Sequence, residues 1–332
     1  MKKRILAVLC ACAMMSSLAA CGETAEKTVE TAKKTTEATT EATTEATTEA
    51  TAEVTESKAG EVSYPVTVTD SEGSEVVIES EPQRIISVAP NITETMYQLG
   101  QEDKLAGRTD YCDYPEQVQE VPSIGTLTEP DIEKIISLDP DLVIASTHFT
   151  AEAEAKLKDL GIKVVVLYEE NEVEGVYSIL QTIGTICNAE TEAAKAVDEM
   201  KVSIQETEDK IKDLDRPSVY YVVGYGEYGD YTAGGDTFVG QLMERAGGSN
   251  IAKDVSGWSY TLESLVEADP DIIILPQDMK EDFMAADNYK DLTAVKNGKV
   301  FGIDNNTIER QGYRNAEGLR SLAEIIHPEA FQ

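Results

Sequence analysis

Runs of consecutive apolar residues recur between residues 85 and 304, separated by stretches with the spacing of amphipathic helices. The strand-like runs are IISVAP (85–90), KLAG (104–107), LVIAS (142–146), KVVVLY (163–168), SVYYVV (218–223), IIIL (272–275) and KVFGID (299–304). Such unbroken runs are typical of parallel strands covered on both faces. Helix-like stretches at 91–100, 151–161 and 236–248 alternate with them, which predicts an α/β fold. Residues 64–80 alternate apolar and polar positions around a turn at 70–73, which predicts a hairpin.

One helix–turn–strand segment occurs twice in the sequence. DIEKIISLDPDLVIA (131–145) and TLESLVEADPDIIIL (261–275) share Glu133/Glu263, Asp139/Asp269, Pro140/Pro270, Asp141/Asp271 and Ile144/Ile274. Most other positions exchange one aliphatic residue for another. The repeat predicts two related α/β lobes.

The first copy carries the signals of a helix start. Thr128 with Asp131 resembles a capping box, and Pro130 suits the first helical turn. The apolar face of this helix is predicted to consist of Ile132, Ile135, Ile136 and Leu138.

Between the two lobes no strand pattern occurs. Residues 189–214 predict one long, highly charged helix that ends before Pro217. The predicted organisation is an N-terminal lobe (64–178), a helical segment with an inter-lobe backbone helix (179–214) and a C-terminal lobe (215–332).

The N-terminus has the pattern of an exported protein. A basic MKKR precedes a short apolar stretch, which predicts a signal peptide over residues 1–20. Leu18-Ala19-Ala20-Cys21 resembles the lipobox of bacterial lipoproteins, which implies cleavage before Cys21 and its acylation. A plain secretory signal is the alternative. Residues 21–63 contain TTEA repeats with few large apolar side chains, and they are predicted to form a disordered stalk.

Charge and cysteine content narrow the function. The formal net charge is −34, and it becomes −37 when Lys2, Lys3 and Arg4 leave with the signal peptide. Such a chain repels nucleic acid and anionic lipid. Only Cys112 and Cys187 remain in the folded part. A disulfide between them is one interpretation, and two buried free thiols are the favoured one.

Several longer segments together resemble a known family. IISVAPNITETMYQLG, GRTDYCDYP, DIEKIISLDPDLVIA and GIKVVVL are similar to the N-terminal lobe of the substrate-binding proteins of ABC importers for iron siderophores, haem and vitamin B12. YTAGGDTFVGQLMERAGGSNIA, WSYTLESLVEADPDIIIL, VKNGKVFGID and ERQGYRN are similar to the C-terminal lobe. The resemblance covers nearly all of 65–332. It implies the class III fold, in which a rigid helix joins two Rossmann-like lobes around a ligand cleft.

The resemblance also implies a role and partners. The chain is expected to be a monomeric, lipid-anchored extracytoplasmic receptor that hands a small-molecule metal chelate to an ABC permease dimer with its ATPase. Neither a cofactor nor catalysis is expected. Glu133 and Glu263 match the glutamates that dock such proteins on permease arginines. Acidic residues are also common in first helical turns, where they favour the helix dipole.

Ligand-binding residues are expected in the loops at the carboxyl ends of the strands. The candidates are Asn91, Tyr111, Thr126, Leu127, His148, Phe149, Tyr225, Trp258, Asn306, Arg310, Tyr313 and Arg314.

The residues of the candidate loops do not identify which chelate is bound. Trp258 and Tyr111 match pocket positions of B12-binding relatives, but Leu127 and Ser146 replace further tryptophans and Asn306 replaces an aspartate. The guanidinium groups of Arg310 and Arg314 suit an anionic chelate, so a ferric siderophore is the first expectation. Cobalamin or another corrinoid, haem, and a non-transport surface receptor or adhesin are the alternatives.

Several candidates have a second interpretation. The loop tyrosines could cap the interface between the lobes instead of binding ligand. Arg310 and Arg314 could instead form ion pairs on this acidic surface. His148 could ligate iron or make an ordinary polar contact, and His327 is expected to be structural.

Two other classes fit poorly. A metal-ion receptor needs three or four clustered ligands, whereas the chain has two histidines. No nucleophile elbow, C-x-x-C, H-E-x-x-H or P-loop motif occurs, which argues against an enzyme.

Overall fold

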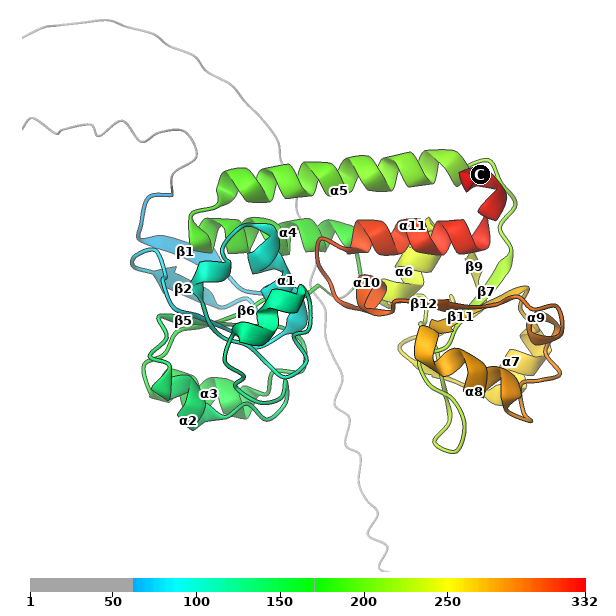
Figure 1. The fold of residues 1–332 in the computed structure, drawn as a ribbon, viewed down its shortest axis with the longest axis horizontal. Helices are drawn as coiled ribbons and strands as arrows, with labels where there is room; N and C mark the ends of the chain where they lie inside the picture. Colours follow the sequence, from blue (N-terminus) through cyan, green and yellow to red (C-terminus); the bar gives the residue numbers. More distant parts are fainter. Residues whose placement is uncertain (1–61, 170) are drawn as a thin grey trace, which may run out of the picture. The chain divides into compact units, whose positions relative to one another are not determined.

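The computed structural model describes residues 62–169 and 171–332 (Figure 1). The predicted signal peptide, Cys21 and almost all of the predicted stalk lie outside the described residues. The described residues all fall within one compact unit, residues 55–332. None of its described helices is both long enough and apolar enough to cross a membrane.

The N-lobe begins with the predicted hairpin, in which β1 (Val66–Thr69) and β2 (Glu75–Ile78) pair antiparallel. It continues with β3 (Ile85–Ser87), α1 (Pro90–Gln98), η1 (Glu102–Lys104), β4 (Leu105–Gly107), η2 (Glu116–Glu120), α2 (Ile132–Ser137), β5 (Leu142–Ala145), α3 (Ala151–Asp159) and β6 (Val164–Val166).

Two helices, α4 (Val173–Cys187) and α5 (Glu190–Ile211), connect the lobes. The C-lobe contains β7 (Ser218–Tyr221), β8 (Asp230–Tyr231), α6 (Phe238–Arg245), β9 (Ser249–Asn250), β10 (Ser259–Tyr260), α7 (Leu262–Ala268), β11 (Ile272–Pro276), η3 (Gln277–Met279), α8 (Lys280–Ala285), α9 (Thr293–Lys296), β12 (Val300–Ile303), α10 (Asn306–Glu309), α11 (Asn315–Ile326) and η4 (Pro328–Phe331).

The main sheets of the two lobes have the same topology. Each has four parallel strands, in the spatial order β4-β3-β5-β6 in the N-lobe and β9-β7-β11-β12 in the C-lobe. When only the four strands of each main sheet are numbered in chain order, both sheets read 2-1-3-4. The repeated segment supplies the third strand and the helix before it, α2–β5 and α7–β11. The repeated sequence thus corresponds to a repeated structural unit, present once in each lobe.

Successive residues of the central strands pack on opposite faces of each sheet. Ile85 of β3 and Ile144 of β5 face a large core that extends through both lobes, whereas Ile86 and Val143 face a separate cluster that includes α2 and α3. In the C-lobe the residues of β7 and β11 alternate in the same way between the shared core and a cluster that includes α7 and α8. The prediction of parallel strands buried on both faces is confirmed.

The shared core is continuous because α5 runs along both α4 and α11, which lie end to end beneath it (Figure 1). Ala193, Val197 and Met200 of α5 are buried in it. The long helix was predicted over 189–214, in close agreement with α5. Helix α4, however, begins at Val173 rather than at residue 179, because Val173 and Val176 already enter the core.

The predicted start of the repeated helix is wrong in the first copy. Asp131 is the N-cap and α2 begins at Ile132, so Pro130 precedes the helix. The Asp131 N–H donates to the Ile124 carbonyl at 2.7 Å, and Gly125 bridges to Pro130. Thr128 and Pro130 therefore belong to a loop that pairs back on itself.

Candidate functional site

The repeated helices α2 and α7, called here the tip helices, are fixed to their lobes in the same way. Asp131 accepts from the Lys134 N–H at 2.9 Å, and Thr261 accepts from the Ser264 N–H at 3.1 Å. Such N-caps satisfy amide groups that the helix leaves without partners. One central aliphatic residue of each helix, Ile135 or Leu265, is completely buried. Each tip helix therefore covers the sheet face opposite the shared core.

The repeated Asp-Pro-Asp also has a structural role. Asp139 (φ 47°) and Asp269 (φ 39°) adopt the left-handed conformation that ends many helices. Asp141 Oδ2 then accepts from the Gln83 and Arg84 N–H groups at 2.7 and 2.9 Å.

The second copy repeats the contact. Asp271 Oδ2 accepts from the Ser218 N–H at 2.9 Å and from the Ser218 hydroxyl at 2.7 Å. The second aspartate thus ties the repeated segment to the residues just before β3 in the N-lobe and to the first residue of β7 in the C-lobe. The hydroxyl bond lowers the pKa of Asp271 below its usual 3.8.

Glu133 and Glu263 occupy equivalent positions in the first turns of the tip helices, and both are exposed. Neither carboxylate forms an ion pair or a side-chain hydrogen bond with another described residue. Both carboxylates are accessible to a partner.

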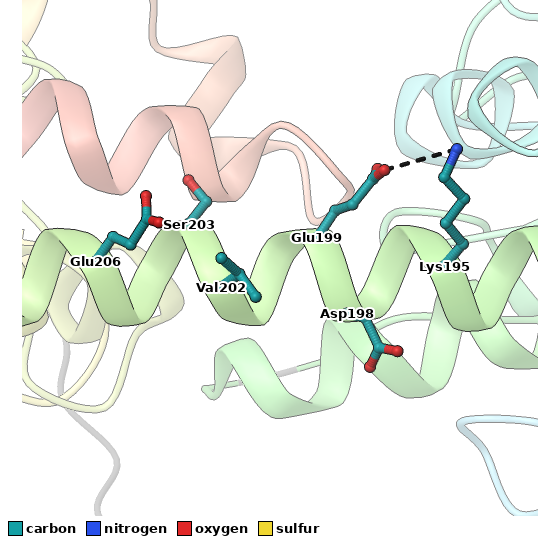
Figure 2. Close-up of a pocket in the computed structure, with 6 residues that line it drawn as sticks. All are labelled: Lys195, Asp198, Glu199, Val202, Ser203 and Glu206. Carbon is teal, nitrogen blue, oxygen red and sulfur yellow. Dashed lines mark ion pairs between the residues drawn. The ribbon is translucent and has the colours of Figure 1, made fainter.

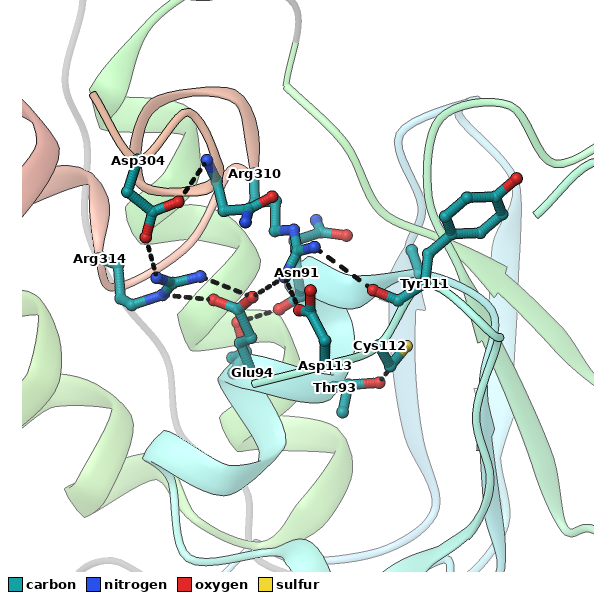
Figure 3. A network of polar contacts seen from close by, with 12 residues as sticks. Asn91, Thr93, Glu94, Tyr111, Cys112, Asp113, Asp304, Arg310 and Arg314 are labelled. Carbon is teal, nitrogen blue, oxygen red and sulfur yellow. Dashed lines mark hydrogen bonds and ion pairs between the residues drawn. The ribbon is translucent and has the colours of Figure 1, made fainter. Parts of the chain in front are cut away.

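A partly buried network of charges joins the lobes (Figure 3). Glu94 of α1 is only 8% exposed, and its two oxygens bind guanidinium groups from the C-lobe. Arg314 binds it through Nε at 2.8 Å and Nη2 at 3.0 Å, and Arg310 Nη1 lies 2.8 Å from Glu94 Oε1. Charge-assisted, two-pronged pairs of this kind fix orientation as well as adding energy.

Two more carboxylates complete this arginine network. Arg310 Nη1 lies 2.6 Å from Asp113 Oδ1, and Arg314 Nη1 lies 3.4 Å from Asp304 Oδ2. Burial alone would raise the pKa of Asp113, but the hydrogen bond and charge of Arg310 outweigh it and lower that pKa. Three carboxylates thus face two guanidinium groups. The network as a whole is negative.

Further contacts tie the same parts of the lobes together. The Tyr114 ring lies under the Arg314 guanidinium, 4.2 Å from its centroid. The Asn91 amide donates to the Gln311 carbonyl at 3.3 Å, and Gln311 Oε1 accepts from the Glu169 N–H at 2.9 Å. Buried Asn91 is therefore a bridging residue between the lobes.

Exposed aromatic side chains lie in loops of both lobes. Tyr111 belongs to the loop that carries Asp113, and its carbonyl accepts from Arg310 Nη2 at 3.3 Å (Figure 3). In the C-lobe, Tyr228 and Trp258 are exposed. Strand β10 directly follows Trp258 and pairs with β8. The Trp258 carbonyl accepts from the Thr232 N–H at 2.8 Å, which joins these two C-lobe loops.

Comparison with known proteins identifies this arrangement. A model of the periplasmic binding protein family matches residues 85–307, about two thirds of the chain. The chain belongs to that family. Two lobes joined by helices are its class III fold.

Two relatives and one solved structure agree with this assignment. The chain is 33% identical to the ABC transporter substrate-binding lipoprotein YvrC of Bacillus subtilis over 81% of this chain and 88% of that protein. It is 31% identical to the cobalamin-binding protein of Halobacterium salinarum, over 80% and 75% respectively. The crystal structure of a "possible" iron-binding, periplasmic solute-binding protein from Staphylococcus epidermidis matches with a TM-score of 0.66 at 29% identity, over 75% of this chain and all of that one.

The chain is thus an extracytoplasmic substrate-binding receptor that works with the permease and ATPase of an ABC importer. Members of this family bind substrates and are not enzymes.

The structure places other predicted ligand residues of this binding protein in packing roles. Leu127 packs against the shared core and Phe149 against the α2–α3 cluster. Tyr225 stands edge-on to Phe283 and Tyr289, with ring centroids 5.1 and 5.5 Å away. These three side chains already have intramolecular partners.

The remaining predicted residues are more dispersed. The Thr126 hydroxyl accepts from the Glu129 N–H at 3.0 Å, and the Tyr313 hydroxyl lies 3.1 Å from Glu199 of α5. His148 is exposed with φ 70°, and its Nδ1 lies 3.1 Å from the Thr147 hydroxyl. Asn306 is half-buried at the start of α10.

Sequence reasoning missed Glu94, Asp113, Asp304 and Gln311. A signal for Glu94 was present, because it lies one helical turn after Asn91, at the carboxyl end of β3. Asp304 directly follows β12, at the carboxyl end of that strand.

Metal ligands and thiols are sparse in the described part. Between residues 62 and 332, leaving out 170, no group of three or more His, Cys, Asp and Glu side chains could hold a metal ion. Cys112 and Cys187 are both free and buried, as favoured from the sequence. Burial raises the pKa of Cys187 to about 12, which makes it a poor nucleophile.

A hollow of about 570 Å³ lies elsewhere, along α5 (Figure 2). Its described lining residues are Lys195, Asp198, Glu199, Val202, Ser203 and Glu206. All of them lie on one helix, which touches a ligand from one side only. The loops at the carboxyl ends of the strands are better placed to surround a small molecule.

Proposed function

We propose that the binding protein captures a corrinoid of the cobalamin type, held between aromatic loop residues of the two lobes. Tyr111 would supply contacts from the N-lobe, and Trp258 with Tyr228 from the C-lobe. The observation that carries this proposal is the contrast between these exposed aromatic rings and the fully partnered arginines of the junction.

The electrostatic argument concerns Arg310 and Arg314. A ferric siderophore was the first expectation because these guanidinium groups suit an anion. In the structure Glu94 and Asp113 already bind Arg310, and Glu94 and Asp304 bind Arg314. An anionic chelate would have to displace these carboxylates and leave them near its own charge. A ligand of low net charge avoids that cost.

The aromatic argument concerns shape. A corrin ring is broad, with apolar surface and neutral amide groups at its edge. Exposed tyrosine and tryptophan rings offer flat apolar area with few rotatable bonds and a polar edge. The cobalamin-binding relative from Halobacterium salinarum supports the same ligand class.

A ferric siderophore remains the second candidate, because Asp113 and Asp304 are the exposed members of the arginine network. Their exposure makes them the carboxylates that an anionic ligand would replace first. Haem is the third candidate ligand.

Isothermal titration calorimetry of the mature protein against cyanocobalamin, haemin, a ferric hydroxamate and a ferric catecholate tests the ligand class. We expect cobalamin to bind at least about 100-fold more tightly than either siderophore, a difference of about 2.7 kcal/mol. Replacing Trp258 by Ala should weaken that binding about tenfold or more. Tighter binding of a siderophore would contradict the proposal and would favour the arginine network as an anion site.

We also propose that Glu133 and Glu263 dock the protein on its permease. Both are exposed, unpaired within the described residues and related by the internal repeat. Two equivalent carboxylates suit a permease built from two subunits, each offering a guanidinium group.

The N-terminus supports a lipid anchor. The lipobox-like sequence before Cys21 and the lipoprotein name of the relative YvrC are its basis. Mass spectrometry of the mature protein should find a diacylglycerol-modified cysteine at position 21. An unmodified N-terminus at another residue would exclude the anchor.

A further inference from the structure

Two exposed aliphatic side chains occupy the same position in the two lobes. Ile136 is 45% exposed and Val266 is 54% exposed, and they correspond in the repeated segment. Ile136 was predicted to lie on the buried face of its helix. That prediction is wrong, because Ile135 makes the core contact and the next residue points to solvent.

Each of these side chains lies three residues after a docking glutamate. Residues i and i+3 of a helix are neighbours on its surface, with Cβ atoms about 5–6 Å apart. Glu133 therefore lies beside Ile136 on α2, and Glu263 lies beside Val266 on α7. The same helices are held by N-caps and by a buried aliphatic residue, so both pairs have a fixed position on the lobe.

Exposure of one aliphatic residue would carry no functional meaning, since scattered apolar side chains are normal on protein surfaces. The recurrence carries the inference. At the flanking positions the copies differ, with Lys134 against Ser264 and Ser137 against Glu267. A carboxylate and an aliphatic residue are kept in both copies, although neither side chain is needed by the core.

Resting on the docking role proposed above, we infer that each tip helix binds one permease subunit through two adjoining contacts. The glutamate pairs with a basic side chain, and Ile136 or Val266 fills an apolar hollow next to it. The apolar contact shields the ion pair from water, which strengthens it. The partner surface is thus a basic residue beside a hydrophobic depression, present once in each subunit.

The test compares apolar and polar residues at these positions. The double variant Ile136→Ser/Val266→Ser of the mature protein is titrated by surface plasmon resonance onto its permease–ATPase complex in lipid nanodiscs. We expect its dissociation constant to rise about tenfold or more. The variant Ile136→Leu/Val266→Leu keeps the apolar contact and should stay within about twofold of the original protein.

A matched control uses exposed aliphatic residues outside the repeat. Leu160 and Val202 are 55% and 57% exposed, so Leu160→Ser/Val202→Ser removes similar apolar surface from one lobe and from α5. It should bind the complex normally. Thermal unfolding and ligand titration of all variants exclude a general effect on folding.

Each outcome has a separate meaning. Unchanged affinity of Ile136→Ser/Val266→Ser, or an equal loss in the control variant, would overturn the inference that Ile136 and Val266 contact the permease. Neither result would contradict the docking role of Glu133 and Glu263. No binding of the original protein to the complex would overturn the docking proposal itself. Self-association that the serine variant abolishes would make this surface a contact between two copies and would also overturn the inference.

Discussion

The N-lobe and the C-lobe are alike at their tip helices and different at the carboxyl ends of their strands. Both main sheets have the same strand order, and both tip helices carry an exposed glutamate and a buried aliphatic residue. An aspartate after each tip helix bonds to the start of the first strand or to the residues just before it. The loops at the carboxyl ends of the strands, by contrast, carry different side chains in the two lobes. The N-lobe supplies Glu94 and Tyr111, whereas the C-lobe supplies the two arginines and Trp258.

This difference separates two tasks. A partner with two equivalent subunits needs the same contact twice, so the tips are kept alike. A small ligand has no such symmetry, and it is recognised by different side chains on its two sides. The internal repeat therefore indicates where the permease binds, and the departures from it indicate where the ligand binds.

The largest expected effect comes from reversing the charge of both tips. Glu133→Arg/Glu263→Arg would place like charges against the basic residues of the permease, which costs several kcal/mol. Ligand uptake into vesicles carrying the permease and ATPase should fall by about 100-fold or more. Affinity for the ligand should not change.

Glu152 and Glu281 provide a matched control for this reversal. They are exposed glutamates in the first turns of α3 and α8, one in each lobe and outside the repeat. Glu152→Arg/Glu281→Arg should transport normally. Equal transport by both double variants would remove the docking role from the tips.

A second effect, on stability rather than on transport, concerns the junction between the lobes. Glu94→Ala would leave Arg310 and Arg314 partly buried without their shared carboxylate. Removing one partner of a buried ion pair costs about 3–5 kcal/mol, and urea unfolding should show a loss of this order. The exposed Asp304 is the control, since Asp304→Ala should cost less than about 1 kcal/mol. Similar losses in the two variants would mean that Glu94 does not organise the junction.

The smallest effect tests the equivalence of the lobes. Asp141→Ala and Asp271→Ala each remove two hydrogen bonds at the start of the first strand of a sheet or just before it, and each should cost about 1–2 kcal/mol of unfolding free energy. The two losses should add, because the aspartates share no partner. A loss confined to one lobe would show that the repeated aspartates differ in role.

Asp271 adds a pH dependence to this prediction. Its pKa is lowered in the folded protein by the hydrogen bond from the Ser218 hydroxyl, so its contribution is present above its usual value of 3.8. That contribution is lost as the pH falls through the lowered value. The stability gap between the original protein and Asp271→Ala should therefore close in acid, and a gap that stays constant would contradict the assignment.

The sheets could be predicted because their strands are unbroken apolar runs. Ile85–Ser87, Leu142–Ala145 and Ile272–Pro276 bury every residue, so no register or partner had to be known to find them. Helix α11 was not predicted, although Leu319, Leu322 and Ile326 have helical spacing. Short elements such as β8 and β10 have two residues each and exist through pairing with one another, which a local pattern does not reveal.

The candidate site was less accessible from the sequence for a physical reason. Glu94 and Arg314 are separated by more than two hundred residues, and each looks like a surface charge on its own. Only the fold shows that they meet and become buried. Ile136 was assigned to the wrong face because Ile135 and Ile136 are adjacent and a short helix has room for one of them in the core.

Electron cryo-microscopy of the protein bound to its permease–ATPase complex tests the central claim most directly. The account predicts that α2 contacts one permease subunit and α7 the other, with Glu133 and Glu263 against basic side chains and the ligand held apart from both tips. A complex in which one lobe alone touches the permease, or in which the tip helices face solvent, would contradict it.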